Sequence, residues 1–216
     1  MGMKWYGKAG ASMSTASFQS KYADNSQSGR AGEVRLESLL KRITDGETIG
    51  FSSVRTPKQG YNTDVDFVLV KGNRVLLIDS KLYKQGGFWF SFGGKLFRNF
   101  IPAHRDKAGN HKAMSRNMSM ARDAFREKLG NDFIVEAITV FVRSDDNKPH
   151  SNTWFTRFPG GIKTLNEASL SGYVHRFFRG ARNDRRTAQA ESFVASITPS
   201  GNRNSGYRRN RRPAGV

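Results

Sequence analysis

Residues 64–82 decide the fold, and they read Asp64-Val-Asp-Phe-Val-Leu-Val-Lys-Gly-Asn-Arg-Val-Leu-Leu-Ile-Asp-Ser-Lys-Leu82. Two runs rich in apolar residues, 64–70 and 74–82, are separated only by a Lys-Gly-Asn turn. Such a pair of runs predicts a β-hairpin. Because both faces of the second run are apolar before its end, we expect this hairpin to be well buried in a sheet.

The hairpin carries acids and a lysine at one end. Because side chains alternate across a strand, Asp64 and Asp66 are predicted to share a face, and so are Asp79 and Lys81. Burying unpaired charge is costly, so these groups must neutralise one another or hold a cation. Carboxylate oxygens suit a hard ion such as Mg²⁺, which also binds substrate phosphate. The pattern therefore predicts either a structural salt-bridge cluster or a metal site.

Apolar residues on either side of the hairpin predict the rest of the core. Two stripes at helical spacing predict one helix that opens at residues 29–33 and another that ends near residue 129. The stripes are Leu36, Leu39, Leu40 and Ile43, and Met114, Met118, Ala121 and Phe125. We expect further strands at 51–55, 133–142 and near 161–163, a second hairpin within 85–100, and a last helix over 166–178. This order predicts an α/β or α+β sandwich with a mixed central sheet flanked by helices.

The two ends of the chain differ in composition from this core. Residues 1–28 are poor in aliphatic side chains and rich in Ser, Gly, Lys and Asn, so we expect a flexible lead-in. Residues 179–216 are rich in arginine with few apolar side chains, so we expect a disordered basic tail. The core domain is therefore placed at residues 29–178.

The composition restricts the class of function. The 216 residues include 36 Lys and Arg against 18 Asp and Glu, a formal net charge of +18. This excess favours nucleic acid or another polyanion as the partner. The chain has no cysteine, which excludes a disulfide scaffold, a thiolate zinc site and a cysteine nucleophile. No apolar run approaches the roughly 18 residues of a membrane span, and no secretory signal is visible, so we expect a cytoplasmic protein without a membrane partner.

Three motifs together resemble the nuclease-related domain (NERD) family, within the restriction-endonuclease-like PD-(D/E)xK superfamily. In chain order they are Gly29-x-x-Gly32-Glu33, Asp64-Val-Asp66-Phe-Val-Leu-Val70 and Leu77-Ile-Asp79-Ser-Lys81. The likeness extends over about residues 29–178 and implies a restriction-endonuclease-like core. Two positions depart from the larger pattern, because Val65 stands in place of the proline and Asp79 in place of the commoner glutamate.

The resemblance assigns roles to these residues. It implies that Asp66, Asp79 and Glu33 hold Mg²⁺ or Mn²⁺ together with the backbone carbonyl of Ser80. It implies that Lys81 assists the attacking water. For Glu33 the alternative is a favourable place for an acid in the first turn of a helix.

Other side chains are candidates for contact with the substrate. Asp64 is a further acid beside the site. Lys84 and Gln85 follow the hairpin directly and could contact a phosphate or a water. In the tail, we expect phosphate contacts that do not read base sequence, from Arg208, Arg209, Arg211 and Arg212.

The sequence therefore predicts a Mg²⁺-dependent nuclease that hydrolyses phosphodiester bonds of nucleic acid, with DNA as the expected substrate and an endonuclease as the expected type. The alternative is a catalytically inactive protein of the same fold that binds or packages DNA and is encoded by a phage, plasmid or other mobile element. The two differ in one observable, because only the enzyme needs a divalent ion for cleavage.

Overall fold

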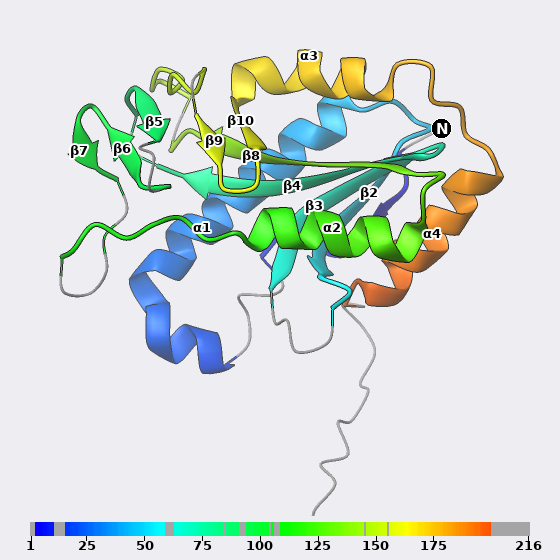
Figure 1. Cartoon of the computed structure of the whole chain (residues 1–216), viewed down its shortest axis with the longest axis horizontal. Coiled ribbons are helices and arrows are strands. Elements are labelled where there is room, and N and C mark those ends of the chain that lie inside the picture. The colour runs from blue at the N-terminus through cyan, green and yellow to red at the C-terminus, as the bar shows by residue number, and fades with distance from the viewer. Residues whose placement is uncertain are drawn as a thin grey trace, which may run out of the picture.

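A computed structural model describes residues 3–10, 16–58, 63–83, 85–90, 94–103, 105, 109–144, 146–154 and 156–199. It contains a seven-stranded sheet with helices on both faces and a separate three-stranded sheet (Figure 1). Within the described ranges, no helix combines the length and the apolar composition that a bilayer crossing requires.

The large sheet is mixed, as predicted, and its strand order is β1-β2-β3-β4-β8-β10-β9. Strands β2, β3 and β4 pair antiparallel, whereas β8 runs parallel to β4 and β10 runs parallel to β8. The bounds are β1 Trp5–Tyr6, β2 Ile49–Arg55, β3 Asp64–Lys71, β4 Arg74–Leu82, β8 Ile134–Val142, β9 Arg157–Phe158 and β10 Ile162–Asn166. The predicted hairpin, β3–β4, is thus central in the sheet.

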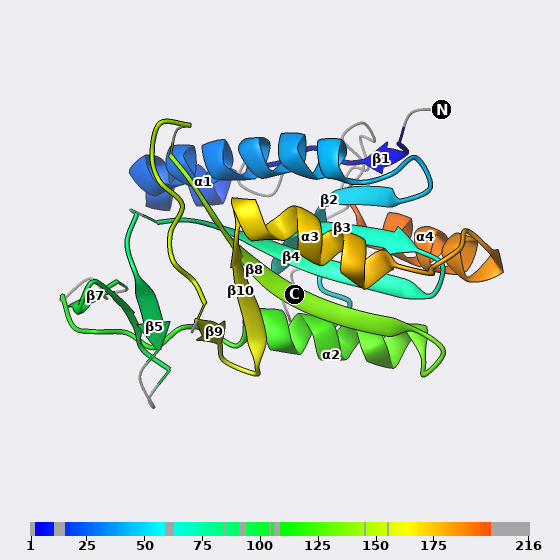
Figure 2. The same ribbon diagram turned by 90° about the horizontal axis from the view of Figure 1, so that it is seen from above.

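Helices α1 (Ala16–Ile43) and α3 (Glu167–Phe178) cover one face of this sheet, and α2 (Asn117–Leu129) and α4 (Arg185–Ile197) cover the other. Figure 2 shows α1 and α2 on opposite sides of the strands. The small sheet consists of β5 (Phe88–Phe90), β6 (Leu96–Arg98) and β7 (Ile101–Pro102). It projects from one end of the molecule, beyond the end of β4 (Figures 1 and 2).

Alternation along β4 divides the apolar interior into two cores. Val75 and Leu77 pack in the core that includes Phe125 of α2 and Val194 of α4. Leu76 and Ile78 pack on the other face, in the core that includes Leu36 and Leu40 of α1 and residues of α3. All four β4 side chains are fully buried. This burial accounts for the apolar character of both faces, because a strand covered on two sides exposes neither.

The N-terminal residues are more structured than the expected lead-in. Strand β1 pairs parallel with β2, and α1 begins at Ala16 instead of near residue 29. Trp5 donates a hydrogen bond from Nε1 to the Ser52 hydroxyl at 2.9 Å. Its ring lies so close to Gly50 that a Cβ there would come within 2.1 Å of it. A two-residue strand has no periodicity, so the spacing of apolar residues could not indicate it.

Helix α4 lies within the segment expected to be a disordered tail. Asp184 begins it with a capping box, in which the Asp184 carboxylate accepts from the Thr187 N–H and the Thr187 hydroxyl accepts from the Asp184 N–H. Ala190 and Val194 are fully buried. The folded part therefore extends beyond the predicted boundary at residue 179. The half-buried Phe193 and Ile197 pack against the same core, but the arginine-rich composition of residues 179–216 as a whole concealed these apolar side chains.

Candidate active site

The charged end of the hairpin places Asp79 and Lys81 beside each other near the end of β4. Lys81 Nζ lies 2.7 Å from Asp79 Oδ1. Both side chains line a small cavity of about 80 Å³, whose other walls include residues of β3 and α2. The prediction that these two residues share a face is confirmed.

Strand β3 changes its alternation at Asp66. Val65 and Val68 belong to the same core, although strict alternation places residues three apart on opposite faces. Phe67 belongs to the other core. On the neighbouring strand the register places Ser53 opposite Asp66, and Ser53 has a φ of +57°. The prediction that Asp64 and Asp66 share a face depended on strict alternation, and strict alternation does not hold at this point.

The carboxylate of Asp66 binds Ser80 of the adjacent strand. Its Oδ2 accepts hydrogen bonds from the Ser80 backbone N–H at 2.7 Å and from the Ser80 hydroxyl at 2.8 Å. Burial, followed by repulsion from Asp79, raises the pKa of Asp66 to about 6. Asp64, by contrast, lines the small cavity with Asp79 and Lys81, and burial raises its pKa as well.

Glu33 approaches these acids from α1. Its side chain is buried, and its Oε2 accepts a hydrogen bond of 2.6 Å from the backbone N–H of Gly10. Burial, followed by the negative charge of Asp66, raises the pKa of Glu33 to about 8. Burial opposes the charged form of Lys81, but Asp79 and Asp66 outweigh it and raise the pKa of the lysine. The structure thus brings all four predicted residues into one electrostatic unit.

These carboxylates have the donor chemistry of a site for a hard cation. Mg²⁺ prefers oxygen ligands, and a cation would relieve the crowding of negative charge that raises the pKa of Asp66 and of Glu33. In the described part of the chain, however, no three acidic or histidine side chains are gathered closely enough for a preassembled site. Lys81 binds Asp79 and Ser80 binds Asp66 instead. The carboxylate oxygens therefore suit a hard cation, provided that Asp79 gives up its contact with Lys81 and Asp66 its hydrogen bonds with Ser80.

Three residues around the site had no signal in the sequence. Thr56 and Thr63 line the small cavity, and their hydroxyl oxygens are buried with no hydrogen-bond partner among the described residues. Tyr83, two residues after Lys81, packs its ring against Phe141 at 5.0 Å between centroids. Burial raises the pKa of Tyr83. Threonine and tyrosine are too common for their positions to be noticed without the fold.

The remaining predicted contacts are placed only in part. Gln85 is half-buried, and its side-chain Nε2 is buried without a partner among the described residues. Lys84, together with the four tail arginines Arg208, Arg209, Arg211 and Arg212, lies outside the described residues.

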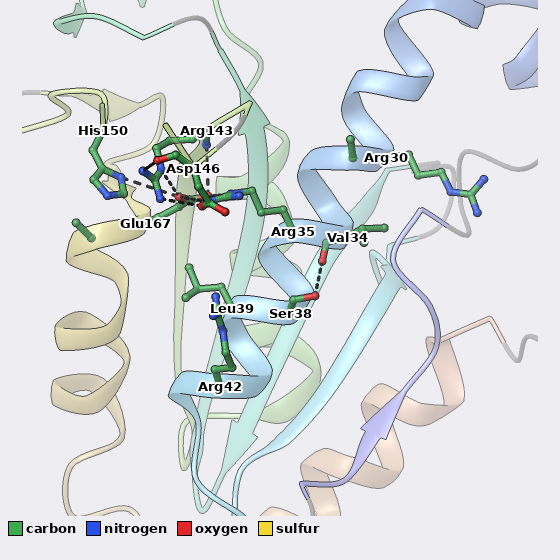
Figure 3. A pocket seen from close by; sticks show the side chains of 12 residues that line it. Arg30, Val34, Arg35, Ser38, Leu39, Arg42, Arg143, Asp146, His150 and Glu167 are labelled. Carbon is green, nitrogen blue, oxygen red and sulfur yellow. Dashed lines mark hydrogen bonds and ion pairs between the residues drawn. The ribbon is translucent and has the colours of Figure 1, made fainter. Parts of the chain in front are cut away.

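A larger cavity, of about 1080 Å³, lies between α1 and the start of α3 (Figure 3). Glu167 is buried there and binds Arg35 at 2.5 Å and Arg143 at 2.8 Å. Burial opposes ionisation of Glu167, but the two arginines outweigh it and lower its pKa. None of the four charged residues of the site lines this cavity. Arg35 and Arg143 pair with Glu167 and Asp146, as in a structural ion-pair network, whereas Arg30 and Arg42 add two further positive charges to the wall.

Residues 28–142 match the family model of the nuclease-related domain (NERD). The matched region covers more than half of the chain and contains Glu33, Asp66, Asp79 and Lys81. It includes most of α1, the β3–β4 hairpin, the small sheet, α2 and β8. No curated protein matches the chain, and no solved structure does.

Proposed function

Because the chain belongs to the nuclease-related domain family, we propose that it is a metal-dependent nuclease that hydrolyses phosphodiester bonds of DNA. One observation carries the proposal. Asp79 and Lys81 form a close ion pair on the wall of a cavity, in a unit whose other members are Asp66 and Glu33. A carboxylate cluster with one lysine at the end of a buried hairpin is suited to phosphoryl chemistry.

The placement of each group supports the role that the proposal gives it. Asp66 and Asp79, with Glu33 from α1, would hold Mg²⁺ or Mn²⁺, and the backbone carbonyl of Ser80 would add a ligand. When bound, the ion would lower the pKa of a water and stabilise charge on the phosphate. Lys81 would release Asp79, orient the attacking water and stabilise negative charge that develops on the phosphate oxygens. Glu33 would lose its proton when the cation binds, because the positive charge of the ion offsets the repulsion between Glu33 and Asp66.

A polyanionic substrate agrees with the charge of the chain. The net charge of +18 favours binding to phosphates without regard to base sequence. Cleavage within a strand, as by an endonuclease, is part of the proposal.

The test is an assay on closed circular, linear and single-stranded DNA, with Mg²⁺, with Mn²⁺ and with EDTA. We expect cleavage of the circular forms with either ion and none in EDTA. Asp79→Asn should abolish cleavage and leave DNA binding intact. The matched control is Asp123→Asn, which removes an exposed carboxylate that also pairs with a basic residue. Absence of cleavage in the wild-type protein with every ion and substrate would refute the proposal.

One observation favours a second candidate, a DNA-binding or packaging protein of a phage or mobile element that does not cut. Asp79 is held by Lys81 and Asp66 by Ser80, so both acids are satisfied without a metal. A protein of this kind would bind DNA equally in Mg²⁺ and in EDTA and would leave every substrate intact. The same assay therefore separates the two candidates.

A further inference from the structure

The hairpin between β6 and β7 holds a phenylalanine in an unfavourable backbone conformation. Arg98 pairs with Ile101, so Asn99 and Phe100 form a two-residue turn. Their φ angles are +47° and +66°. Turns of this kind favour asparagine followed by glycine, because a bulky side chain at positive φ is strained. Phe100 nevertheless occupies the glycine position and is 86% exposed. A bulky ring that is both exposed and held at positive φ points to a function.

A second exposed aromatic residue is attached to the same segment. Trp154 is 85% exposed, and its backbone N–H donates to the side chain of Asn152. Asn152 in turn pairs with the segment Gly86–Phe88, through the Phe88 N–H at 3.0 Å and the Gly86 carbonyl at 3.1 Å. The Asn99 N–H donates to the Gly87 carbonyl at 3.0 Å. Phe100 and Trp154, here called the aromatic tips, are therefore both anchored to residues 86–88.

This anchor lies close to the proposed active site along the chain. Gly86 is the fifth residue after Lys81, and five residues span at most about 18 Å. The small sheet projects beyond the end of β4 (Figure 2). The segment to which Phe100 and Trp154 are anchored therefore lies near the cavity beside Asp79 and Lys81.

The stretch of chain that contains Phe100 is strongly basic. Residues 82–121 include seven Lys and Arg and a single acid, Asp106. Among these, exposed basic side chains in the described part are Lys95, Arg105, Lys112 and Arg116. Exposed rings among exposed cations complement a nucleic acid strand, which offers base faces for stacking and phosphates for ion pairs.

We propose that Phe100 and Trp154 form a stacking platform for the unpaired bases of single-stranded nucleic acid. A duplex cannot use this platform, because its base faces are covered by the neighbouring bases, and it would meet only the cations. The proposed binding of single strands rests only on the exposure of the two rings, the backbone conformation of Phe100 and the basic residues. Its consequence, that cleavage favours single-stranded regions, rests on the function proposed for the neighbouring site.

Binding is measured in EDTA, so the outcome does not depend on cleavage. The probes are a fluorescein-labelled oligothymidylate of about 20 nucleotides and a duplex of the same length. Phe100→Gly should weaken binding of the single strand by about fivefold or more. It should also keep or raise the melting temperature, because glycine tolerates a φ of +66°. Trp154→Ala should weaken binding by a similar factor, whereas Trp154→Phe retains most of the affinity.

The matched control is Ile134→Ala, which truncates another exposed apolar side chain, 45% exposed at the start of β8. It should leave the affinity for both probes unchanged. The proposal is overturned if Phe100→Gly and Trp154→Ala both bind the single strand as tightly as the wild type. It is also overturned if the duplex loses as much affinity as the single strand, or if the wild-type protein does not bind the single strand. Absence of cleavage with intact binding would refute only the proposed nuclease function.

Discussion

The backbone amide of Gly10 donates a hydrogen bond of 2.6 Å to the buried Oε2 of Glu33. The neighbouring amide of Ala9 donates to Oε2 of Glu37 at 2.8 Å. The Lys8 carbonyl accepts from the hydroxyl of Ser53 at 3.1 Å. The N-terminal segment is thus fastened both to α1 and to the strand next to Asp66. It supplies the donor that a buried carboxyl group needs, since an unsatisfied one is costly.

The raised pKa of Glu33 predicts how stability depends on pH. Below about pH 4.5 the group is protonated in the folded and unfolded states, and above about pH 8 it is ionised in both. Between these values the folded state binds the proton more tightly, so the contribution of Glu33 to stability decreases as the pH rises. In EDTA, Glu33→Gln should remove this decrease and be more stable than the wild type at pH 9, by up to a few kcal/mol.

Urea unfolding of both proteins at pH 5, 7 and 9 measures this effect. The difference in unfolding free energy between Glu33→Gln and wild type should grow with pH and level off above about pH 8. Glutamine keeps an oxygen that can accept from the Gly10 N–H. The comparison therefore isolates the ionisation of Glu33 from the loss of this hydrogen bond. A difference that does not change with pH would show that folding does not raise the pKa of Glu33.

Metal binding should depend on pH in the opposite direction. Glu33 and Asp66, with pKa values of about 8 and 6, must release protons before they bind a cation. The increase in melting temperature that saturating Mg²⁺ gives should therefore be larger at pH 8.5 than at pH 5.5. In Asp66→Asn the increase should be small at both values. An equal increase at both values in the wild type would exclude these carboxylates as the ligands.

Truncation tests the assignment of α4 to the fold. Deleting residues 180–216 removes Ala190 and Val194 from the core, so we expect a protein that melts far below the wild type or does not fold. Deleting residues 201–216 should leave the melting temperature unchanged and reduce the salt dependence of DNA binding. Val194→Ala should cost about 1–3 kcal/mol of unfolding free energy. Normal melting after the longer deletion would contradict the packing of α4.

The hairpin at residues 64–82 could be predicted from the sequence because its signals are local. A continuous apolar run and a glycine-containing turn specify two paired strands without reference to the rest of the chain. The pairing of Asp79 with Lys81 followed from alternation alone and is confirmed. The same rule was wrong at Asp66, because the positive φ of Ser53 on the neighbouring strand accompanies a change of face that spacing within β3 cannot reveal.

Contacts between distant segments could not be predicted. The bond from Gly10 to Glu33 joins residues 23 apart in sequence, and neither residue has a pattern that specifies the other. The exposure of Phe100 depends likewise on the turn in which it lies. Helix α4 was missed because its few apolar side chains stand within a segment that is rich in arginine overall. Local periodicity therefore gave the scaffold together with Asp66, Asp79 and Lys81, and the family resemblance added Glu33, whereas the partners of these residues required the fold.

Lys81 distinguishes an enzyme from a protein that has only kept the fold. If Lys81 serves solely as the counter-ion of Asp79 and Asp66, its removal leaves two carboxylates to repel each other, and Lys81→Ala should be destabilised with or without metal. If Lys81 acts on the substrate, Mg²⁺ can replace its charge. Lys81→Ala should then melt normally in Mg²⁺ yet cut slowly or not at all.

Lys81→Arg sharpens this test because it keeps the positive charge. The planar group of arginine does not reproduce the contact that the compact ammonium makes at 2.7 Å from Asp79. We expect Lys81→Arg to fold and bind DNA as the wild type does, with cleavage reduced by roughly 100-fold or more. Melting and cleavage are followed together while Mg²⁺ is titrated into wild type, Lys81→Ala and Lys81→Arg. Full cleavage by Lys81→Arg would mean that only the charge matters, and full cleavage by Lys81→Ala would remove Lys81 from the reaction.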